Sequence, residues 1–254
     1  MSPQAPSQPA TRSAPRFLDL GDRAITVEFG NAIDPALLAR VAALDEACAR
    51  AALPGVVETV PTFRSLSIVF DPLVTSRAEL LPALEALLAQ DISADTAPAR
   101  RWRLPACYGG AFSPDLDEVA QRCGISADAL VQLHAGREYV VYMLGFLPGF
   151  PFMGDVAEAL RLPRRAEPRV AVPAGSVAIA NGLTAVYPWQ SPGGWHLLGH
   201  CPVPLFDAGR ASPALLAAGD KVCFEVVDAA EYARIAQALA TGELAPEAFV
   251  GAAT

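Results

Sequence analysis

Four arginines fall within nine residues of this sequence, in the segment RLPRRAEPR, with a single acidic residue among them. The arginines are Arg161, Arg164, Arg165 and Arg169. A guanidinium group is a planar fork of N–H donors that suits carboxylate and phosphate oxygens. The prolines at positions 163 and 168 favour an extended backbone. The segment therefore predicts an anion site, and the alternative is a solvated loop with weak surface salt bridges.

A second segment, SPGGWH, places two consecutive glycines just before a histidine. The backbone N–H groups of Gly193 and Gly194 can point at one oxygen, and His196 can transfer a proton near neutral pH. This combination suits a developing oxyanion, although a lone histidine is more often a hydrogen-bonded structural residue. His196 and His200 have the HxxxH spacing of zinc ligands. Because the flanking Gly and Pro favour a strand and no carboxylate or cysteine pair completes the set, no metal site is predicted.

A third segment, GFLPGFPFMG, alternates glycines and prolines with aromatic residues. Glycine permits close backbone approach and proline fixes φ, so Phe150 and Phe152 could wall a rigid pocket. The alternative is a structural turn whose phenylalanines belong to an ordinary core. The segment is not a P-loop, because no lysine follows it.

A Pro-Ala-Gly turn in the segment VPAGSV would present Ser176. A serine nucleophile needs a base, and the GxSxG pattern is absent. We therefore expect Ser176 to occupy a turn or to hydrogen-bond a substrate.

The composition of the 254-residue chain limits the function classes. Hydrophobic residues make up 52% of it, and no apolar run approaches the ~20 residues of a membrane-spanning helix. The net charge of −8 has the wrong sign for a protein that binds nucleic acid. The N-terminal residues lack the apolar stretch of a signal peptide. These features predict a globular cytoplasmic protein that binds neither membrane nor nucleic acid.

The elements that must position these segments follow from the hydrophobic pattern. Residues 1–15 are rich in proline and predict a disordered tail. Residues 16–92 predict an α+β domain of order ββαββα, with helices over about 35–52 and from 77 to about 90. The polar, proline-bearing segment 91–100 predicts a domain junction. In residues 99–254, Ser113-Pro114 predicts the start of a helix, and short strands between turn residues predict a mainly-β barrel or sandwich.

Several ordered motifs of the chain resemble the B-subunit family of 5-oxoprolinase, also called the allophanate hydrolase subunit 1 or KipI-like family. The motifs are CYGGAFSPDLDEVAQRCG, EYVVYMLGFLPGFPFMG, PRRAEPRVAVPAGSVAIA, VYP and SPGGWHLLGH. The resemblance is strongest from Cys107 to His200 and extends more weakly over most of the chain. It implies an N-terminal α+β domain followed by a cyclophilin-like β-barrel domain.

The resemblance also implies a function. Members of this family work in a complex with separate C and A subunits. The complex uses ATP, with Mg²⁺ as its counter-ion, to open 5-oxoproline to glutamate. By this resemblance Arg164, Arg165 and Arg169 would clamp the anion. Gly193 and Gly194 would donate to the reacting oxygen, and His196 would be a proton shuttle or hydrogen-bond donor.

Two other functions fit the same motifs. One is inhibition of a sensor histidine kinase, as in the kinase-inhibitor branch of the family. The other is a carboxyltransferase-like role on urea or allophanate, because related domains occur in urea carboxylase. The identity of neighbouring genes would distinguish the first of these from the role in 5-oxoprolinase.

Overall fold

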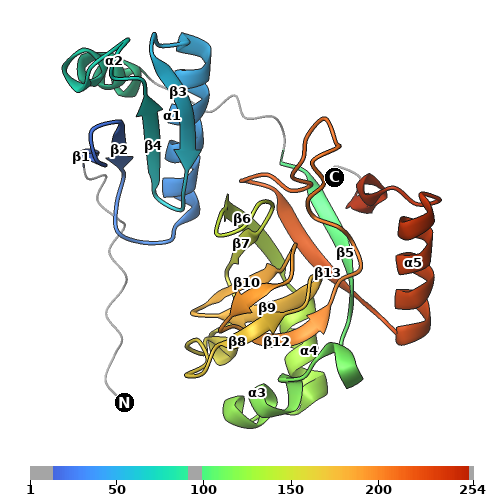
Figure 1. Ribbon diagram of the computed structural model, residues 1–254. Helices are drawn as coiled ribbons and strands as arrows, with labels where there is room; N and C mark the ends of the chain where they lie inside the picture. The colour runs from blue at the N-terminus through green and yellow to red at the C-terminus, as the bar shows by residue number, and fades with distance from the viewer. Residues whose placement is uncertain (1–13, 91–98, 252–254) are drawn as a thin grey trace, which may run out of the picture. The chain divides into compact units, whose positions relative to one another are not determined.

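The computed structural model describes residues 14–90 and 99–251. The chain divides into two compact units, residues 1–97 and 98–254, and each is described by itself (Figure 1). The predicted tail up to residue 13 and the predicted junction at residues 91–98 lie outside the described residues. Among the described residues, every helix is too short or too polar to span a lipid bilayer.

The first unit contains a four-stranded antiparallel sheet of order β1-β2-β4-β3 and two helices. The strands are β1 (Arg16–Asp19), β2 (Ala24–Glu28), β3 (Val56–Pro61) and β4 (Ser65–Phe70), and the helices are α1 (Pro35–Ala51) and α2 (Arg77–Ala89). Alternate strand residues such as Ile25 and Ile68 share a buried cluster with Leu44 of α1 and Leu84 of α2. Consecutive residues of a strand point to opposite faces of the sheet, so these alternate residues share one face. Both helices therefore pack on that face.

The helices of the first unit begin where their capping residues stand. Asp34 accepts a hydrogen bond from the backbone N–H of Ala36, at 2.7 Å. Ser76 and Glu79 form a reciprocal capping box at the start of α2. The predicted starts of both helices are confirmed.

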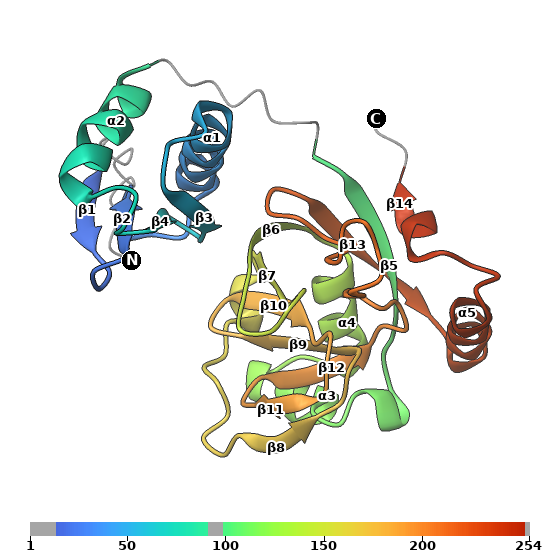
Figure 2. The same cartoon turned by 45° about the horizontal axis from the view of Figure 1, so that its top comes forward.

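The second unit is built on a closed β-barrel (Figures 1 and 2), whose ring contains seven of the described strands. The ring runs β12-β9-β10-β7-β6-β13-β5 and closes where His200 of β12 pairs with Cys107 of β5. The strands are β5 (Arg101–Cys107), β6 (Glu138–Leu144), β7 (Pro151–Gly154), β9 (Ser176–Ala180), β10 (Leu183–Val186), β12 (His196–His200) and β13 (Lys221–Val227). The barrel predicted for this part of the chain is therefore confirmed.

Helices and short elements surround the barrel. The helices are α3 (Leu116–Cys123), α4 (Ala127–Ala135) and α5 (Ala229–Thr241), and the 3-10 turns are η1 (Gly110–Phe112), η2 (Glu158–Leu160) and η3 (Pro246–Phe249). Strand β14 (Val250–Gly251) pairs with the start of β5. Two further strands, β8 (Arg169–Val172) and β11 (Ser191–Gly193), form a separate two-stranded sheet.

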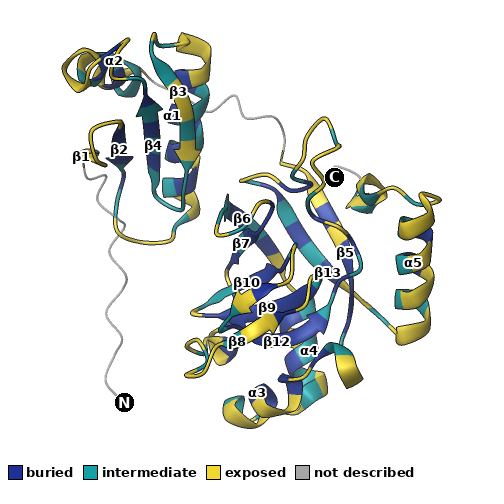
Figure 3. Ribbon diagram, viewed as in Figure 1, coloured by how far each residue is buried: buried dark blue, intermediate teal, exposed yellow. Residues whose placement is uncertain are grey.

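Strand β9 is buried on both faces, as its dark blue ribbon in Figure 3 shows. Val177 and Ile179 belong to the large core cluster, together with Val119 of α3 and Leu130 of α4. Ala178 and Ala180 belong to a second cluster with aromatic side chains: Phe150, Tyr187 and Trp195. The small β9 side chains facing the second cluster leave room for these large rings.

Helix α3 begins two residues later than the sequence pattern predicts. Its N-terminal capping position is Asp115, whose side chain makes no capping hydrogen bond. Ser113 instead accepts a hydrogen bond from the backbone N–H of Gly109, at 2.7 Å. The Asp115 carboxylate instead accepts hydrogen bonds from residues that are distant in the sequence.

Candidate active site

The three segments singled out in the sequence meet around Trp195. Its ring packs edge-on against Phe150 and Phe152, with ring centroids 5.9 and 6.0 Å apart. The backbone N–H of Arg165 donates to the carbonyl oxygen of Gly194, at 2.7 Å. Strands β8 and β11 also join the arginine and glycine segments, with Gly193 opposite Arg169 (Figure 2). The aromatic turn, the arginine segment and the Gly-Gly-Trp-His segment therefore form one region.

Asp115, which the sequence analysis did not single out, holds the arginine segment in place. Its Oδ1 accepts from Arg165 at 3.1 Å and from Arg169 at 2.5 Å, and its side chain is 3% exposed. Its Oδ2 accepts from the backbone N–H of Leu197 at 2.7 Å. A buried carboxylate persists only when it is paired and hydrogen-bonded. Two of the three predicted anion-binding arginines are thus engaged by one carboxylate.

The third arginine, Arg164, differs from the other two. It is exposed and makes no ion pair with any residue in the described ranges. Arg165 has a further partner in Glu118, at 3.2 Å. Of the three arginines, Arg164 is therefore the one whose charge is free to meet a ligand.

Several buried polar atoms in this region have no hydrogen-bond partner among the described residues. They are Arg165 Nε, Arg169 Nη1, Ser191 Oγ and His196 Nδ1. Buried polar atoms in folded proteins are nearly always hydrogen-bonded, so a local group of exceptions requires an explanation. Because two of the four are guanidinium N–H groups, an anionic ligand would satisfy them.

His196 lies on the other side of its strand from the aromatic cluster. It pairs opposite Ile179, whose side chain is in the large core cluster, whereas Trp195 belongs to the second cluster. The imidazole is fully buried, and its Nε2–H donates to the carbonyl oxygen of Pro163 at 2.9 Å. His196 thereby anchors the start of the arginine segment, and Nδ1 is its remaining polar atom.

Gly193 lies against the hydroxyl of Tyr187, a second residue that the sequence analysis did not select. A Cβ on Gly193 would stand 2.4 Å from the Tyr187 hydroxyl oxygen, so only glycine fits there without a shift. Gly194 has more room, with its nearest neighbours at 3.7 Å. Its carbonyl is the acceptor for Arg165.

Phe150 and Phe152 line the second hydrophobic cluster, with ring centroids 4.9 Å apart. Ser176 is buried at the start of β9, and its carbonyl accepts from the backbone N–H of Tyr187 at 2.9 Å. The turn before it requires Gly175, whose φ of +86° is unfavourable for other residues. The structure thus places Ser176 beside Tyr187, next to the aromatic cluster.

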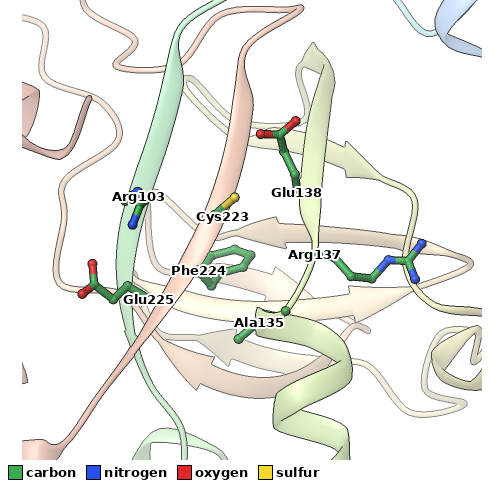
Figure 4. A pocket seen from close by; sticks show the side chains of 8 residues that line it. Arg103, Ala135, Arg137, Glu138, Cys223, Phe224 and Glu225 are labelled. Atoms are coloured by element: carbon green, nitrogen blue, oxygen red, sulfur yellow. The ribbon is translucent and has the colours of Figure 1, made fainter. Parts of the chain in front are cut away.

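A hollow of the second unit lies elsewhere. It has a volume of about 500 Å³ and is lined by Arg103, Ala135, Gly136, Arg137, Glu138, Cys223, Phe224 and Glu225 (Figure 4). None of the predicted site residues lines it. Within the described ranges there is also no group of three His, Cys, Asp or Glu side chains that could hold a metal ion.

Residues 15–216 match the family described as carboxyltransferase domain, subdomain C and D. The chain is 39% identical over 224 residues to the 5-oxoprolinase B subunit of Bacillus subtilis (strain 168), a match covering 84% of this chain and 93% of that protein. It is 45% identical over 174 residues to the 5-oxoprolinase B subunit of Escherichia coli O157:H7, covering 68% of this chain and 78% of that protein. The fold and these matches define a carboxyltransferase-type domain.

Within that class, the chain belongs to the B-subunit family of 5-oxoprolinase. Its structure is similar to the crystal structure of TTHA0988, with a TM-score of 0.72 and 41% sequence identity. The match covers 81% of this chain and 40% of that one, so this chain spans less than half of the solved protein.

Proposed function

We propose that this chain is the B subunit of a cytoplasmic, ATP-dependent 5-oxoprolinase that opens 5-oxo-L-proline to L-glutamate together with the C and A subunits. The identity to proteins named as 5-oxoprolinase B subunits supports the assignment. The observation in the structure that carries it is the group of unpartnered buried polar atoms around the arginine segment.

The reaction needs help because a five-membered lactam is a poor electrophile. Overall, 5-oxoproline, ATP and two waters give glutamate, ADP and phosphate. ATP, with Mg²⁺ as its counter-ion, would supply the phosphoryl group that makes the carbonyl oxygen a leaving group. A site for this chemistry needs cations at the phosphates and donors at the developing negative charge.

The described residues fit those needs. Arg164 presents a free guanidinium group, while Arg165 and Arg169 each keep one buried guanidinium nitrogen without a partner among the described residues. Asp115 fixes the orientation of the latter two arginines without occupying all of their donors. The three arginines would bind the anion. Because Asp115 already holds two of them in place, less conformational entropy is lost on binding.

His196 has a supporting role in this proposal. Because its Nε2 proton is held by the carbonyl of Pro163, the residue orients the arginine segment. Its free Nδ1 would accept one hydrogen bond from a ligand or a water molecule. Gly193 and Gly194 would bring backbone donors to the arginine segment, and Phe150 and Phe152, on the other side of β12 from His196, would wall the site there.

A reconstitution tests the assignment. The chain is mixed with the C and A subunits, ATP and 5-oxoproline, and glutamate is measured with each protein omitted in turn. The proposal predicts that glutamate forms only when this chain is present. Glutamate formation at the full rate without the chain would overturn it, and would favour the kinase-inhibitor alternative if the chain instead slowed autophosphorylation of a sensor kinase.

A further inference from the structure

Tyr187 follows β10 and points into the second hydrophobic cluster. Its ring meets Phe150 edge-to-face, with centroids 5.0 Å apart and planes at 90°. The side chain is 1% exposed, and both backbone groups are used: its N–H donates to Ser176 and its carbonyl accepts from Gly175. The position of the phenol ring is therefore fixed by packing and by two main-chain hydrogen bonds.

The hydroxyl of Tyr187 has no hydrogen-bond partner among the described residues, unlike the hydroxyls of two other tyrosines of this unit. Tyr139 donates to the carbonyl of His134 at 2.7 Å, and Tyr232 is bonded to His200 at 2.7 Å. The Tyr187 oxygen instead lies against the bare backbone of Gly193. Because no described residue bonds this hydroxyl, it is available to a partner from outside the chain.

The charge around the hydroxyl favours an anionic partner. Burial raises the pKa of the Tyr187 phenol to about 12, and the nearby charges of Arg164 and Arg169 oppose that rise. The phenol is therefore protonated at neutral pH and is available as a donor. A neutral O–H donor beside two guanidinium groups suits an oxygen that gains negative charge, because hydrogen bonds to charged acceptors are the strong ones.

We propose that Tyr187 is a catalytic residue whose hydroxyl donates a hydrogen bond to the former carbonyl oxygen of the phosphorylated amide. Negative charge develops on this oxygen after water has added to the ring carbon, when the bond from that carbon to the oxygen breaks and phosphate leaves. The inference rests on the proposed function and adds a residue to that site. It also explains why Gly193 must lack a side chain: a Cβ there would displace the hydroxyl. No proton is transferred in this step, since the phenol only shares its hydrogen.

The test compares Tyr187→Phe with the wild type in the reconstituted complex. The substitution removes one oxygen atom and keeps the ring, so we expect thermal unfolding to be unchanged or slightly improved. Loss of one donor to a developing oxyanion lowers kcat by on the order of 100-fold. The KM for ATP should stay the same, because the arginines remain in place. Calorimetry without ATP measures the dissociation constant of 5-oxoproline. The substitution should raise this constant by a smaller factor than the factor by which kcat falls.

Tyr232→Phe is the matched control, because it removes a tyrosine hydroxyl bonded within the chain, and it should retain the wild-type kcat. A Tyr187→Phe enzyme whose kcat is within about threefold of the wild-type kcat overturns the inference while the proposed function stands. The same holds for a variant in which only the KM for ATP is raised. A wild-type complex that forms no glutamate overturns the proposed function, and the inference that rests on it falls as well.

Discussion

The carboxylate of Asp115 and the guanidinium of Arg169 form an ion pair, with Oδ1 and Nη2 2.5 Å apart, that ties the start of α3 to β8. The two residues are 54 positions apart in the sequence. The same oxygen meets Arg165, and the other oxygen accepts the backbone N–H of Leu197. One buried side chain thus connects a helix, the arginine segment and a barrel strand.

Replacing Asp115 should destabilise the second unit. Asp115→Ala leaves two partly buried guanidinium groups and the Leu197 N–H without their acceptor. Breaking a buried pair by removing one partner costs about 3–5 kcal/mol, and the partial exposure of the arginines points to the lower end. Urea denaturation measures the free energy of unfolding. Asp117→Ala, in the exposed first turn of α3, is the control and should change it by less than about 1 kcal/mol. Equal effects of the two variants would contradict the structural role of Asp115.

The glycine pair should respond unequally to alanine. In Gly193→Ala the new Cβ would meet the Tyr187 hydroxyl, whereas in Gly194→Ala it would meet neighbours at ordinary contact distance. Overpacking costs about 1–3 kcal/mol, so we expect that loss of stability for Gly193→Ala and a change near zero for Gly194→Ala. Adding Tyr187→Phe to Gly193→Ala should restore part of the loss, because it removes the clashing oxygen. Thermal unfolding of the four proteins measures this, and full additivity of the two substitutions would show that the contact is absent.

The buried histidine of α4 should make stability depend on pH. Burial lowers the pKa of His134 to about 3, against 6.5 for an ordinary histidine. Between these values the unfolded chain binds a proton that the folded chain does not, so stability rises with pH in this window and is lost as pH falls from about 6.5 towards 3. The slope for one group approaches ~1.4 kcal/mol per pH unit. Urea denaturation at pH 7.0, 6.0 and 5.0 should therefore show a steeper fall for the wild type than for His134→Gln. The same slope in both proteins would contradict the burial of an uncharged His134.

The tautomer of His134 follows from its partners. The Thr184 hydroxyl donates to the carbonyl of Ala178, so it accepts from the Nε2–H of His134, at 2.9 Å. Nδ1 then accepts from the Tyr108 hydroxyl, at 2.8 Å. Nitrogen chemical shifts should report the Nε2–H form, unchanged between pH 7 and 5. A shift to the doubly protonated form within that range would be incompatible with the buried network.

Much of the fold follows from local signals in the sequence. The capping residues Asp34 and Ser76 fix the starts of α1 and α2, because a cap acts on the next few residues alone. The strands Arg169–Val172 and Ser176–Ala180 are separated by the Pro-Ala-Gly turn, as the predicted pattern of short strands between turn residues requires. The start of α3 is an exception, because Ser-Pro predicts a start two residues too early. Local sequence gives no sign of the role of Asp115, since its arginine partners lie 50 or more positions away.

The candidate site was less accessible to sequence reasoning for the same reason. The arginine cluster and the Gly-Gly pair are conspicuous in composition, and the structure brings them together. Spacing cannot tell that Arg165 and Arg169 share one buried carboxylate while Arg164 stays free. Spacing also cannot show that the hydroxyl of Tyr187, a residue that no motif marks, lies against Gly193. Both facts depend on tertiary packing.

The most direct test of the account compares two exposed arginines, neither of which has an ion pair in the described part of the chain: Arg164 in the arginine segment and Arg137 beside the large hollow. Glutamate formation by the reconstituted complex is measured over a range of ATP concentrations with Arg164→Gln and Arg137→Gln. A charged hydrogen bond contributes about 1.5–3 kcal/mol, so the account predicts a KM for ATP raised at least ~10-fold in Arg164→Gln, with unchanged thermal unfolding, and a wild-type KM in Arg137→Gln. A wild-type KM for ATP in Arg164→Gln, in a complex that forms glutamate normally, would contradict the claim that the arginine segment binds the anion.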